Sequence, residues 1–370
     1  MRRQLSRRGF IATAALAAGT TPVAACSTSG TAYGRAVAET WRPFGAGKTS
    51  ERRALHRELV RYATLAPSSH NTQCWNFKLE TQRISILPDL ARRCPVVDPD
   101  DHHLFVSLGC AAENLVIAGR AHGLHGNASF DPAAGPAVHI DFEPAKAVAS
   151  ALFHAIPMRQ CTRAAYDGQP LAPAELRQLE AAATGRGVQV LFLTARDQVE
   201  QVLNYVVEGN SAQLNDRAFM KELLQWIRFS DGEAVAKRDG LFSRASGSPS
   251  LPRWFAAPLF ELLFTPRGDN EKYTKFIRSS AGIAVFVADA SDKEHWVETG
   301  RCYERFVLQA TAMGVRTAML NQPVEVASVR PQFAAAIGIG KRRPDLVVRF
   351  GHGPEMPRSL RRSVDAVIVA

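Results

Sequence analysis

Two short segments of the chain carry residue types that could hold a polar ligand. The first covers residues 67–75, with the sequence PSSHNTQCW, and it lies between a helical pattern and a strand-like run. Proline, serine and asparagine are common turn formers. The turn would offer backbone N–H groups, hydroxyls and amides beside the aromatic ring of Trp75. This set suits a polar, planar ligand such as a flavin ring, and it equally fits an ordinary helix-to-strand loop.

The second segment covers residues 159–163, with the sequence RQCTR. Arg159 and Arg163 are four positions apart with a hydroxyl between them, and guanidinium groups in such a pair can cradle a phosphate. A further basic run, Arg358-Ser359-Leu360-Arg361-Arg362, lies near the C-terminus and could close on the same anion. Both runs also fit solvated basic surface.

Other candidate sites have weaker patterns. Asp98, Asp100, Asp101, His102 and His103 could bind a metal, but adjacent histidines seldom share one ion, so we interpret this cluster as a solvated turn. The sequence has no GxSxG nucleophile elbow and no Walker spacing. We therefore predict no metal site and assign no catalytic side chain.

The composition is that of a globular protein with a basic balance. The 370 residues suffice for one large domain or two ordinary ones, 46% are hydrophobic, and the formal net charge is +10. This charge suits anionic ligands. Because no run interleaves aromatic and basic residues, we predict no nucleic-acid partner.

The N-terminus has the pattern of a targeting segment rather than of a folded element. Residues 6–11, SRRGFI, match a twin-arginine export signal, and a weakly apolar stretch follows to Ala25. Cys26 fits either a lipobox or a site just after ordinary cleavage. We expect an exported protein, in the periplasm or on the outer face of the cell membrane, that touches the membrane only through a lipid on Cys26. Residues 27–50 have the composition of a linker.

Apolar spacing predicts a mixture of helices and strands. The expected helices cover residues 50–65, 104–122, 172–183, 198–227 and 297–313. The expected strands lie within residues 75–87, 137–142, 188–193, 281–288 and 346–350, and residues 230–270 are expected to be irregular.

Residues 108–124 and 299–315 indicate an internal duplication. Both segments carry Gly, Glu, Val, Ala and Gly at the same offsets. Both predicted helices are apolar nearly all round, as expected for buried helices. We therefore expect the two helices to meet where two similar halves of the protein join.

The first segment resembles the PSSxNxQPW turn of the FMN-dependent nitroreductases, and the second resembles their Arg-x-Ser-x-Arg/Lys phosphate motif. From about residue 50 onward the chain resembles the Acg-type, twin-arginine subgroup, in which two nitroreductase-like halves are fused. The resemblance implies an α+β fold with halves at residues 51–150 and 151–370, joined as an intramolecular pseudo-dimer. Cys74 and Cys161 depart from the family pattern, where Pro and Ser are usual.

The same resemblance implies one FMN per chain, held between the halves, and a protein able to act as a monomer. Cofactor contacts then fall on Pro67, Ser68, Ser69, Asn71 and Gln73 for the ring and ribityl chain; Arg159, Cys161 and Arg163 for the phosphate; Arg361 or Arg362 for a third cation; and Asn321, Gln322 and Pro323 near the flavin N5 edge.

Three functions follow from these patterns. The first is an FMN oxidoreductase that passes a hydride to a small nitro, quinone or related acceptor, with NAD(P)H or another electron donor. The second is a non-catalytic protein that sequesters, stores or senses FMN, and the third is a flavin-free exported binding lipoprotein. The apolar residues within 230–270 fit either a lid over the flavin or a cap on the core.

Overall fold

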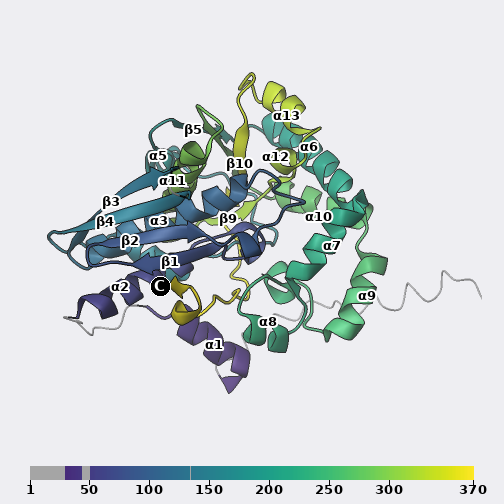
Figure 1. Ribbon diagram of the computed structural model, residues 1–370. Helices are drawn as coiled ribbons and strands as arrows, with labels where there is room; N and C mark the ends of the chain where they lie inside the picture. The colour runs from purple at the N-terminus through teal and green to yellow at the C-terminus, as the bar shows by residue number, and fades with distance from the viewer. Residues whose placement is uncertain (1–29, 44–50, 134) are drawn as a thin grey trace, which may run out of the picture.

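The computed structural model describes residues 30–43, 51–133 and 135–370 (Figure 1). The expected export signal, Cys26 and part of the expected linker lie outside these residues. Within the described part of the linker, residues Ala32–Thr40 form helix α1, so the expectation of a plain linker is wrong there. Thr31 caps this helix by accepting a hydrogen bond from the N–H of Gly34.

The first sheet has five strands in the order β11-β1-β2-β4-β3. Every pairing is antiparallel except that of β1 with β11, which is parallel. Its strands are β1 (Trp75–Leu79), β2 (Arg83–Pro88), β3 (Leu124–Asp131), β4 (Ala137–Pro144) and β11 (Ile368–Val369). The sequence predicted β1, β2 and β4. It missed β3, which has polar residues and a glycine, and β11, which is only two residues long.

The second sheet has four antiparallel strands in the order β5-β8-β10-β9. They are β5 (Val188–Leu193), β8 (Gly282–Ala288), β9 (Arg316–Met319) and β10 (Pro344–Gly351). Ala284 and Phe286 of β8 face the main core, whereas Ile283 and Val285 face a second core. Burial on both faces explains why β8 reads as a continuous apolar run rather than an alternating one.

Two long helices, α3 (His102–Ala121) and α11 (Lys293–Ala312), pack against each other between the sheets. A Cβ atom added to Gly109 would lie 2.0 Å from the carbonyl oxygen of Val297, and one added to Gly300 would lie 2.0 Å from that of Val106. Each glycine therefore allows a close backbone approach that no larger residue permits. The predicted central position of both helices is confirmed.

Helix α3 is long and apolar enough to cross a membrane, but 83% of its most apolar window is buried inside the protein. Its N-terminus is fixed by Asp98, whose carboxylate accepts from the N–H groups of His103 at 3.0 Å and Leu104 at 2.9 Å. Asp98, His102 and His103 are buried, so the expectation of a solvated turn is wrong for them. A hydrogen bond of 2.9 Å joins His102 Nε2 to Asp345 Oδ1.

Residues 216–264 form a third group of elements, which follows α6 and lies below α6 and α10 in Figure 1. The group comprises α7 (Arg217–Trp226), β6 (Ile227–Arg228), α8 (Asp231–Lys237), β7 (Leu241–Phe242) and α9 (Arg253–Leu263). The expectation that residues 230–270 are irregular is wrong, because two helices form there and a third, α10, begins at Pro266. Gly, Pro and Ser interrupt the apolar residues of this segment, so the sequence shows no clear helical periodicity there.

The remaining helices cover the sheets. They are α2 (Arg52–Thr64), α4 (Ala151–Ala155), α5 (Pro173–Ala183), α6 (Arg196–Asn215), α10 (Pro266–Arg278), α12 (Gln322–Glu325) and α13 (Arg330–Ala336). Helices α2 and α5 and the helical part of residues 198–227 were predicted from the sequence. The α+β class that the sequence implied is confirmed.

Candidate functional site

A cavity of about 540 Å³ lies among the turn after α2, helices α6, α7, α9 and α10, and the start of α12. A smaller pocket of about 80 Å³ adjoins it, and the two share Pro67, Ser68, Cys161, Arg163 and Leu241 in their linings. We call the smaller pocket the arginine lobe, because Arg159, Arg163, Arg358 and Arg361 line it.

The turn after α2 has an unusual backbone. His70, Asn71 and Gln73 have φ angles of 46°, 53° and 54°, in the left-handed region that non-glycine residues rarely adopt. Such conformations persist only where surrounding contacts impose them. Here the hydroxyl of Ser68 accepts from the N–H of Gln73 at 2.9 Å, and the hydroxyl of Ser107 accepts from the N–H of Ser69 at 3.3 Å. The strained turn presents Ser68, Ser69 and His70 to the cavity.

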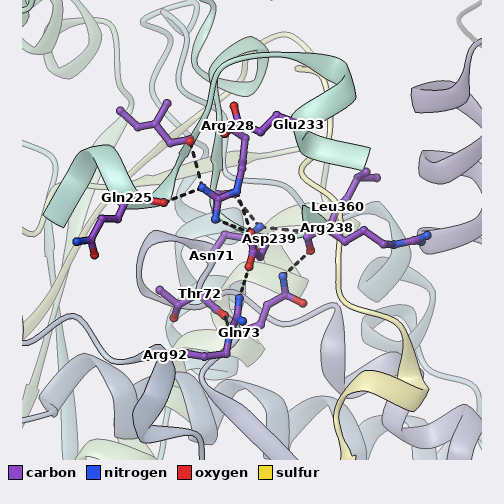
Figure 2. A network of polar contacts seen from close by, with 12 residues as sticks. Asn71, Thr72, Gln73, Arg92, Gln225, Arg228, Glu233, Arg238, Asp239 and Leu360 are labelled. Carbon is purple, nitrogen blue, oxygen red and sulfur yellow. Dashed lines mark hydrogen bonds and ion pairs between the residues drawn. The ribbon is translucent and has the colours of Figure 1, made fainter. Parts of the chain in front are cut away.

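The amides of the turn hold two distant segments in place. Asn71 Nδ2 donates to the carbonyls of Gly240 at 3.0 Å and Leu360 at 3.3 Å (Figure 2). Gln73 Nε2 donates to the carbonyl of Arg238 at 2.9 Å, and its Oε1 accepts from the N–H of Arg362 at 2.7 Å. These bonds place residues 238–240 and 360–362 against the turn.

An ion-pair network supports the same junction. Asp239 pairs with Arg228 at 2.6 Å and with Arg92, whose Nε donates to the carbonyl of Thr72 at 2.6 Å (Figure 2). Because Arg228 and Asp239 are both nearly buried, loss of Asp239 would leave the charge of Arg228 unpaired. The segment that precedes β7 is therefore fixed beside the cavity.

The arginine lobe collects four positive charges, and the carboxylate that pairs with Arg159, that of Glu304, lies behind its lining at 3.9 Å. Among the described residues that line it, none is an Asp or a Glu. Arg159 and Arg361 both donate to the carbonyl of Leu65, at 3.0 Å and 3.4 Å, and Arg358 donates to the carbonyl of Met158 at 3.1 Å. Arg163 differs from these three, since no residue in the described ranges forms a hydrogen bond or ion pair with it.

Burial and like charge both disfavour the charged state of the arginines in this lobe. Burial, together with the positive charge of Arg159, lowers the pKa of Arg361 well below its ordinary value. Burial raises the pKa of Glu304 to about 7, although Arg159 opposes this shift from 3.9 Å away. Buried charges are stable only when paired or hydrogen-bonded. The lobe is thus suited to a bound anion.

Helix α1 closes the outer side of this lobe. The ring of Trp41 lies 5.0 Å from the guanidinium of Arg358 and 4.9 Å from that of Arg361, within cation–π range. Trp41 Nε1 also donates to the carbonyl of Ser359 at 3.0 Å, and the hydroxyl of Tyr33 donates to the carbonyl of Arg358 at 2.7 Å. The sequence analysis missed these contacts because residues 27–50 read as a linker.

A buried arginine positions the segment that carries Cys161 and Arg163. Arg349 of β10 donates to the carbonyls of Thr162 at 3.0 Å and Ala164 at 2.8 Å, and its guanidinium lies 4.0 Å from the ring centre of Tyr166. In the sequence, Arg349 stands within an apolar run, and an arginine in such a run needs buried hydrogen-bond acceptors. This position could have indicated its structural role.

Four polar side chains form part of the wall of the larger cavity. Asn321 Oδ1 accepts from the N–H of Val347 at 3.0 Å, and its Nδ2 lies 3.5 Å from His103 Nε2. Glu325 lies 3.8 Å from His103 and accepts from Gln213 Nε2 at 2.6 Å. Burial lowers the pKa of His103 to about 3 and raises that of Glu325. The imidazole is therefore neutral near pH 7.

Helix α10 adds a second polar group to this wall. Asp269, Lys272 and Tyr273 line the cavity. Burial raises the pKa of Asp269 and lowers that of Lys272. The sequence analysis missed these three residues, because nothing in a polar helical face distinguishes a cavity wall from solvated surface.

The structure places the residues expected at the site in three groups. Those that line the larger cavity are Pro67, Ser68, Ser69, Cys161, Arg163, Asn321 and Gln322. Those that line the arginine lobe are Pro67, Ser68, Asn71, Arg159, Cys161, Arg163 and Arg361. Those that line neither are Gln73, Pro323 and Arg362. Arg362 instead donates to the carbonyls of Gln73 at 3.3 Å and Ala366 at 2.6 Å.

No family model matches the chain. Two curated relatives from Mycobacterium tuberculosis cover most of it. One, named "Putative NAD(P)H nitroreductase acg", is 24% identical over 84% of this chain and 94% of its own length. A second protein with the description NAD(P)H nitroreductase is 25% identical over 84% of this chain and 90% of its own length. The resemblance to Acg-type nitroreductases is confirmed.

Solved nitroreductase structures match parts of the chain. A nitroreductase with bound FMN from Bacteroides fragilis covers 55% of this chain and 88% of its own, with 14% identity and a TM-score of 0.34. The FMN-dependent nitroreductase NfnB from Mycobacterium smegmatis, in complex with NADPH, covers 59% of this chain and 91% of its own, with 12% identity and a TM-score of 0.37.

Proposed function

Because the chain is similar to Acg-type nitroreductases over most of its length, we propose that it is an FMN-binding oxidoreductase. The observation that carries the proposal is the arginine lobe. It holds four arginines, one of them unpaired within the described residues, and it opens into a larger cavity with a polar wall. A phosphate in the small lobe and a ring system in the larger cavity would fill both spaces.

The residues of the lobe fit a phosphate ester. Arg163 belongs to both linings, so a phosphate bound to its guanidinium would leave the rest of the ligand facing the larger cavity. Guanidinium groups bind phosphate in a bidentate manner. Cys161 is a poorer hydrogen-bond donor than the serine of the family motif, so arginines would supply most of the affinity. The cavity volume of about 540 Å³ is within the range of about 300–1,000 Å³ for small-molecule sites.

We also propose that the two halves form a fused pseudo-dimer and that one chain completes one site. The reciprocal contacts of Gly109 with Val297 and of Gly300 with Val106 support this proposal, since each helix makes the same contact at the same spacing. The turn at residue 68 and the basic segment at residue 163 come from different halves. A chain that elutes as a monomer with one FMN would agree with the proposal, and an FMN that requires two chains would refute it.

Bound FMN would supply hydride transfer, and the protein would supply position and electrostatics. The arginine lobe would anchor the phosphate, and the strained turn would present Ser68 and Ser69 to the polar edge of the ring. Burial keeps the proton on the Glu325 carboxyl to a higher pH than in water, so Glu325 can hold a proton at the cavity wall. Apolar residues from α7 and α9 line the rest of the cavity.

We propose that NAD(P)H is the electron donor and that a nitro compound, quinone or related electrophile is the acceptor. The test begins with the absorption spectrum of protein purified from cytoplasm, which should show flavin bands. NADPH added without oxygen should bleach those bands, and a nitroaromatic or quinone should restore them. Bound FMN that neither NADH, NADPH nor dithionite reduces would refute the oxidoreductase and favour storage or sensing. Protein without flavin bands that binds no added FMN would refute both.

We propose further that the chain is exported by the twin-arginine route. Ser6-Arg7-Arg8-Gly9-Phe10-Ile11 supports the proposal, and Cys26 supports a lipid anchor. Replacement of both arginines by lysine (Arg7→Lys, Arg8→Lys) should leave the protein in the cytoplasm, and Cys26→Ser should release it from membranes. Export of the lysine variant at the normal level would contradict the route.

A further inference from the structure

One part of the larger cavity is apolar. Its lining residues come from the end of α6, from α7, from the loop before α8 and from α9, and include Leu214, Phe219, Leu223, Phe229, Leu259 and Phe260. Most of them belong to an apolar cluster that is separate from the two cores of the sheets. We call this part of the cavity the apolar lobe.

The wall of the apolar lobe is part of this apolar cluster. Phe219, Leu223 and Phe229 are buried members of the cluster, and each also lines the cavity. Protein interiors are normally packed about as densely as organic crystals. Apolar side chains that line a cavity gain dispersion contacts when an apolar ligand packs against them. An apolar ligand would make those contacts here.

The lobe reaches the surface along α9. Leu263 lines the cavity, yet it is 63% exposed. Trp254 and Leu262 of the same helix are exposed as well, at 79% and 74%. Large exposed apolar side chains gathered on one element mark a site where apolar material is bound. One helix therefore connects an apolar part of the surface with the apolar lobe.

We propose that the apolar lobe binds the hydrocarbon chain of a lipid-like electron acceptor whose reactive head lies on the polar side of the cavity. This proposal rests on the proposed oxidoreductase function. The apolar lobe offers no charge for the phosphate of a flavin and no polar contact for the pyrimidine edge of its ring. Each methylene buried there would tighten binding by about fourfold. The acceptor class is an amphiphile with a polar, reducible ring and an apolar tail.

The test compares two naphthoquinones that differ only in the tail, menadione and its analogue with a decyl group in place of the methyl. Binding is measured by calorimetry on the protein with its bound flavin oxidised and no donor present, so the readout does not depend on turnover. We expect the decyl compound to bind at least tenfold more tightly than menadione, and its kcat/KM to rise in parallel. Equal affinities would overturn the proposal, whereas tight binding without turnover would contradict only the oxidoreductase function.

The substitution Leu259→Gln places a polar amide in the lobe, and Leu262→Gln makes the same change on the exposed side of the same helix. We expect Leu259→Gln to weaken decyl binding at least fivefold while menadione binding stays unchanged. Leu262→Gln should alter neither affinity when both compounds are in solution. If Leu259→Gln still binds the decyl compound more tightly than menadione by the same factor, the decyl group does not lie in this lobe.

A second arm identifies the source of the tailed acceptor. The decyl compound is offered as a monomer in buffer or embedded in vesicles of phosphatidylglycerol and phosphatidylcholine, with Cys26→Ser in every protein to remove any acyl anchor. Reduction of the embedded compound that Leu262→Gln slows would identify a membrane as the source. Reduction of the monomeric compound alone would identify a dissolved lipid. Both results support binding of the tail in the apolar lobe. A protein that reduces menadione but reduces the decyl compound in neither form would overturn the proposal.

Discussion

The two ends of the cavity are built by opposite means. The arginine lobe gathers four buried or half-buried cations, and hydrogen bonds to backbone carbonyls hold three of them. The apolar lobe contains no charged group among its six named residues and is held by packing between α7 and α9. A ligand would gain charge-assisted hydrogen bonds at one end and dispersion contacts at the other.

Under the proposed function, this difference gives the two ends separate tasks. A charged lobe discriminates strongly, because a ligand without an anion leaves the arginines uncompensated. An apolar lobe discriminates gradually, by the amount of hydrocarbon that it buries. The arginine lobe would then determine specificity for the cofactor, and the apolar lobe would determine specificity among acceptors.

The largest effect should follow Arg163→Ala. Arg163 has no partner within the described residues, so its loss should leave the fold intact and remove one charge-assisted contact to phosphate. A contact of this kind contributes about 1.5–3 kcal/mol, so FMN affinity should fall by about 10- to 100-fold. Quenching of flavin fluorescence measures the affinity. Arg267→Ala is the matched control, because the Arg267 side chain is 91% exposed; an equal loss in both variants would contradict the assignment.

Asn71→Ala tests how the arginine lobe is held. The substitution removes the donor that serves the carbonyls of Gly240 and Leu360. The Leu360 carbonyl keeps a hydrogen bond from Arg361 Nη1 at 3.1 Å, so the loss falls mainly on the Gly240 carbonyl. Removing a buried hydrogen-bond donor costs about 1–3 kcal/mol, so the free energy of unfolding should fall by about that amount. Urea denaturation measures it. Asn215 is exposed at the end of α6, and Asn215→Ala should change stability by less than about 0.5 kcal/mol; equal effects would show that the turn does not depend on these bonds.

The pH dependence of FMN binding tests the charge balance of the arginine lobe. Glu304, with a pKa of about 7, lies 3.9 Å from Arg159. A phosphate near Arg159 disfavours the ionised carboxylate, so binding requires a proton on Glu304 once the pH exceeds 7. FMN affinity should then fall by up to about tenfold per pH unit above pH 7. Glu304→Gln should abolish this decline, and a decline that persists in the variant would assign it to another group.

The smallest effect should follow Leu259→Gln when FMN is the ligand. If the apolar lobe serves the acceptor and not the cofactor, FMN affinity should change by less than about twofold, as for a substitution remote from the binding contacts. The same fluorescence titration measures it. A loss of FMN affinity as large as that in Arg163→Ala would show that the apolar lobe is part of the FMN site.

The same contrast shows what the sequence could reveal. Local chemistry or spacing was enough to single out three features in the sequence. They are the turn at residue 68, the basic segment at residue 163, and helices α3 and α11 with Gly109 and Gly300. Trp41, Arg349 and the apolar lobe were not predictable, because each acquires its role from segments far away in the chain. Gln73 and Arg362 show the opposite limit: they match a motif, yet the structure uses their hydrogen bonds to join segments rather than to line the cavity.

The most direct test of the arginine lobe is a titration of flavin-free protein with FMN and with riboflavin, which has the same ring system but no phosphate. The account predicts one FMN per chain and an affinity for FMN at least about 100-fold higher than that for riboflavin, as expected for two or more charge-assisted contacts. Equal affinities for the two flavins, or no binding of either, would contradict it.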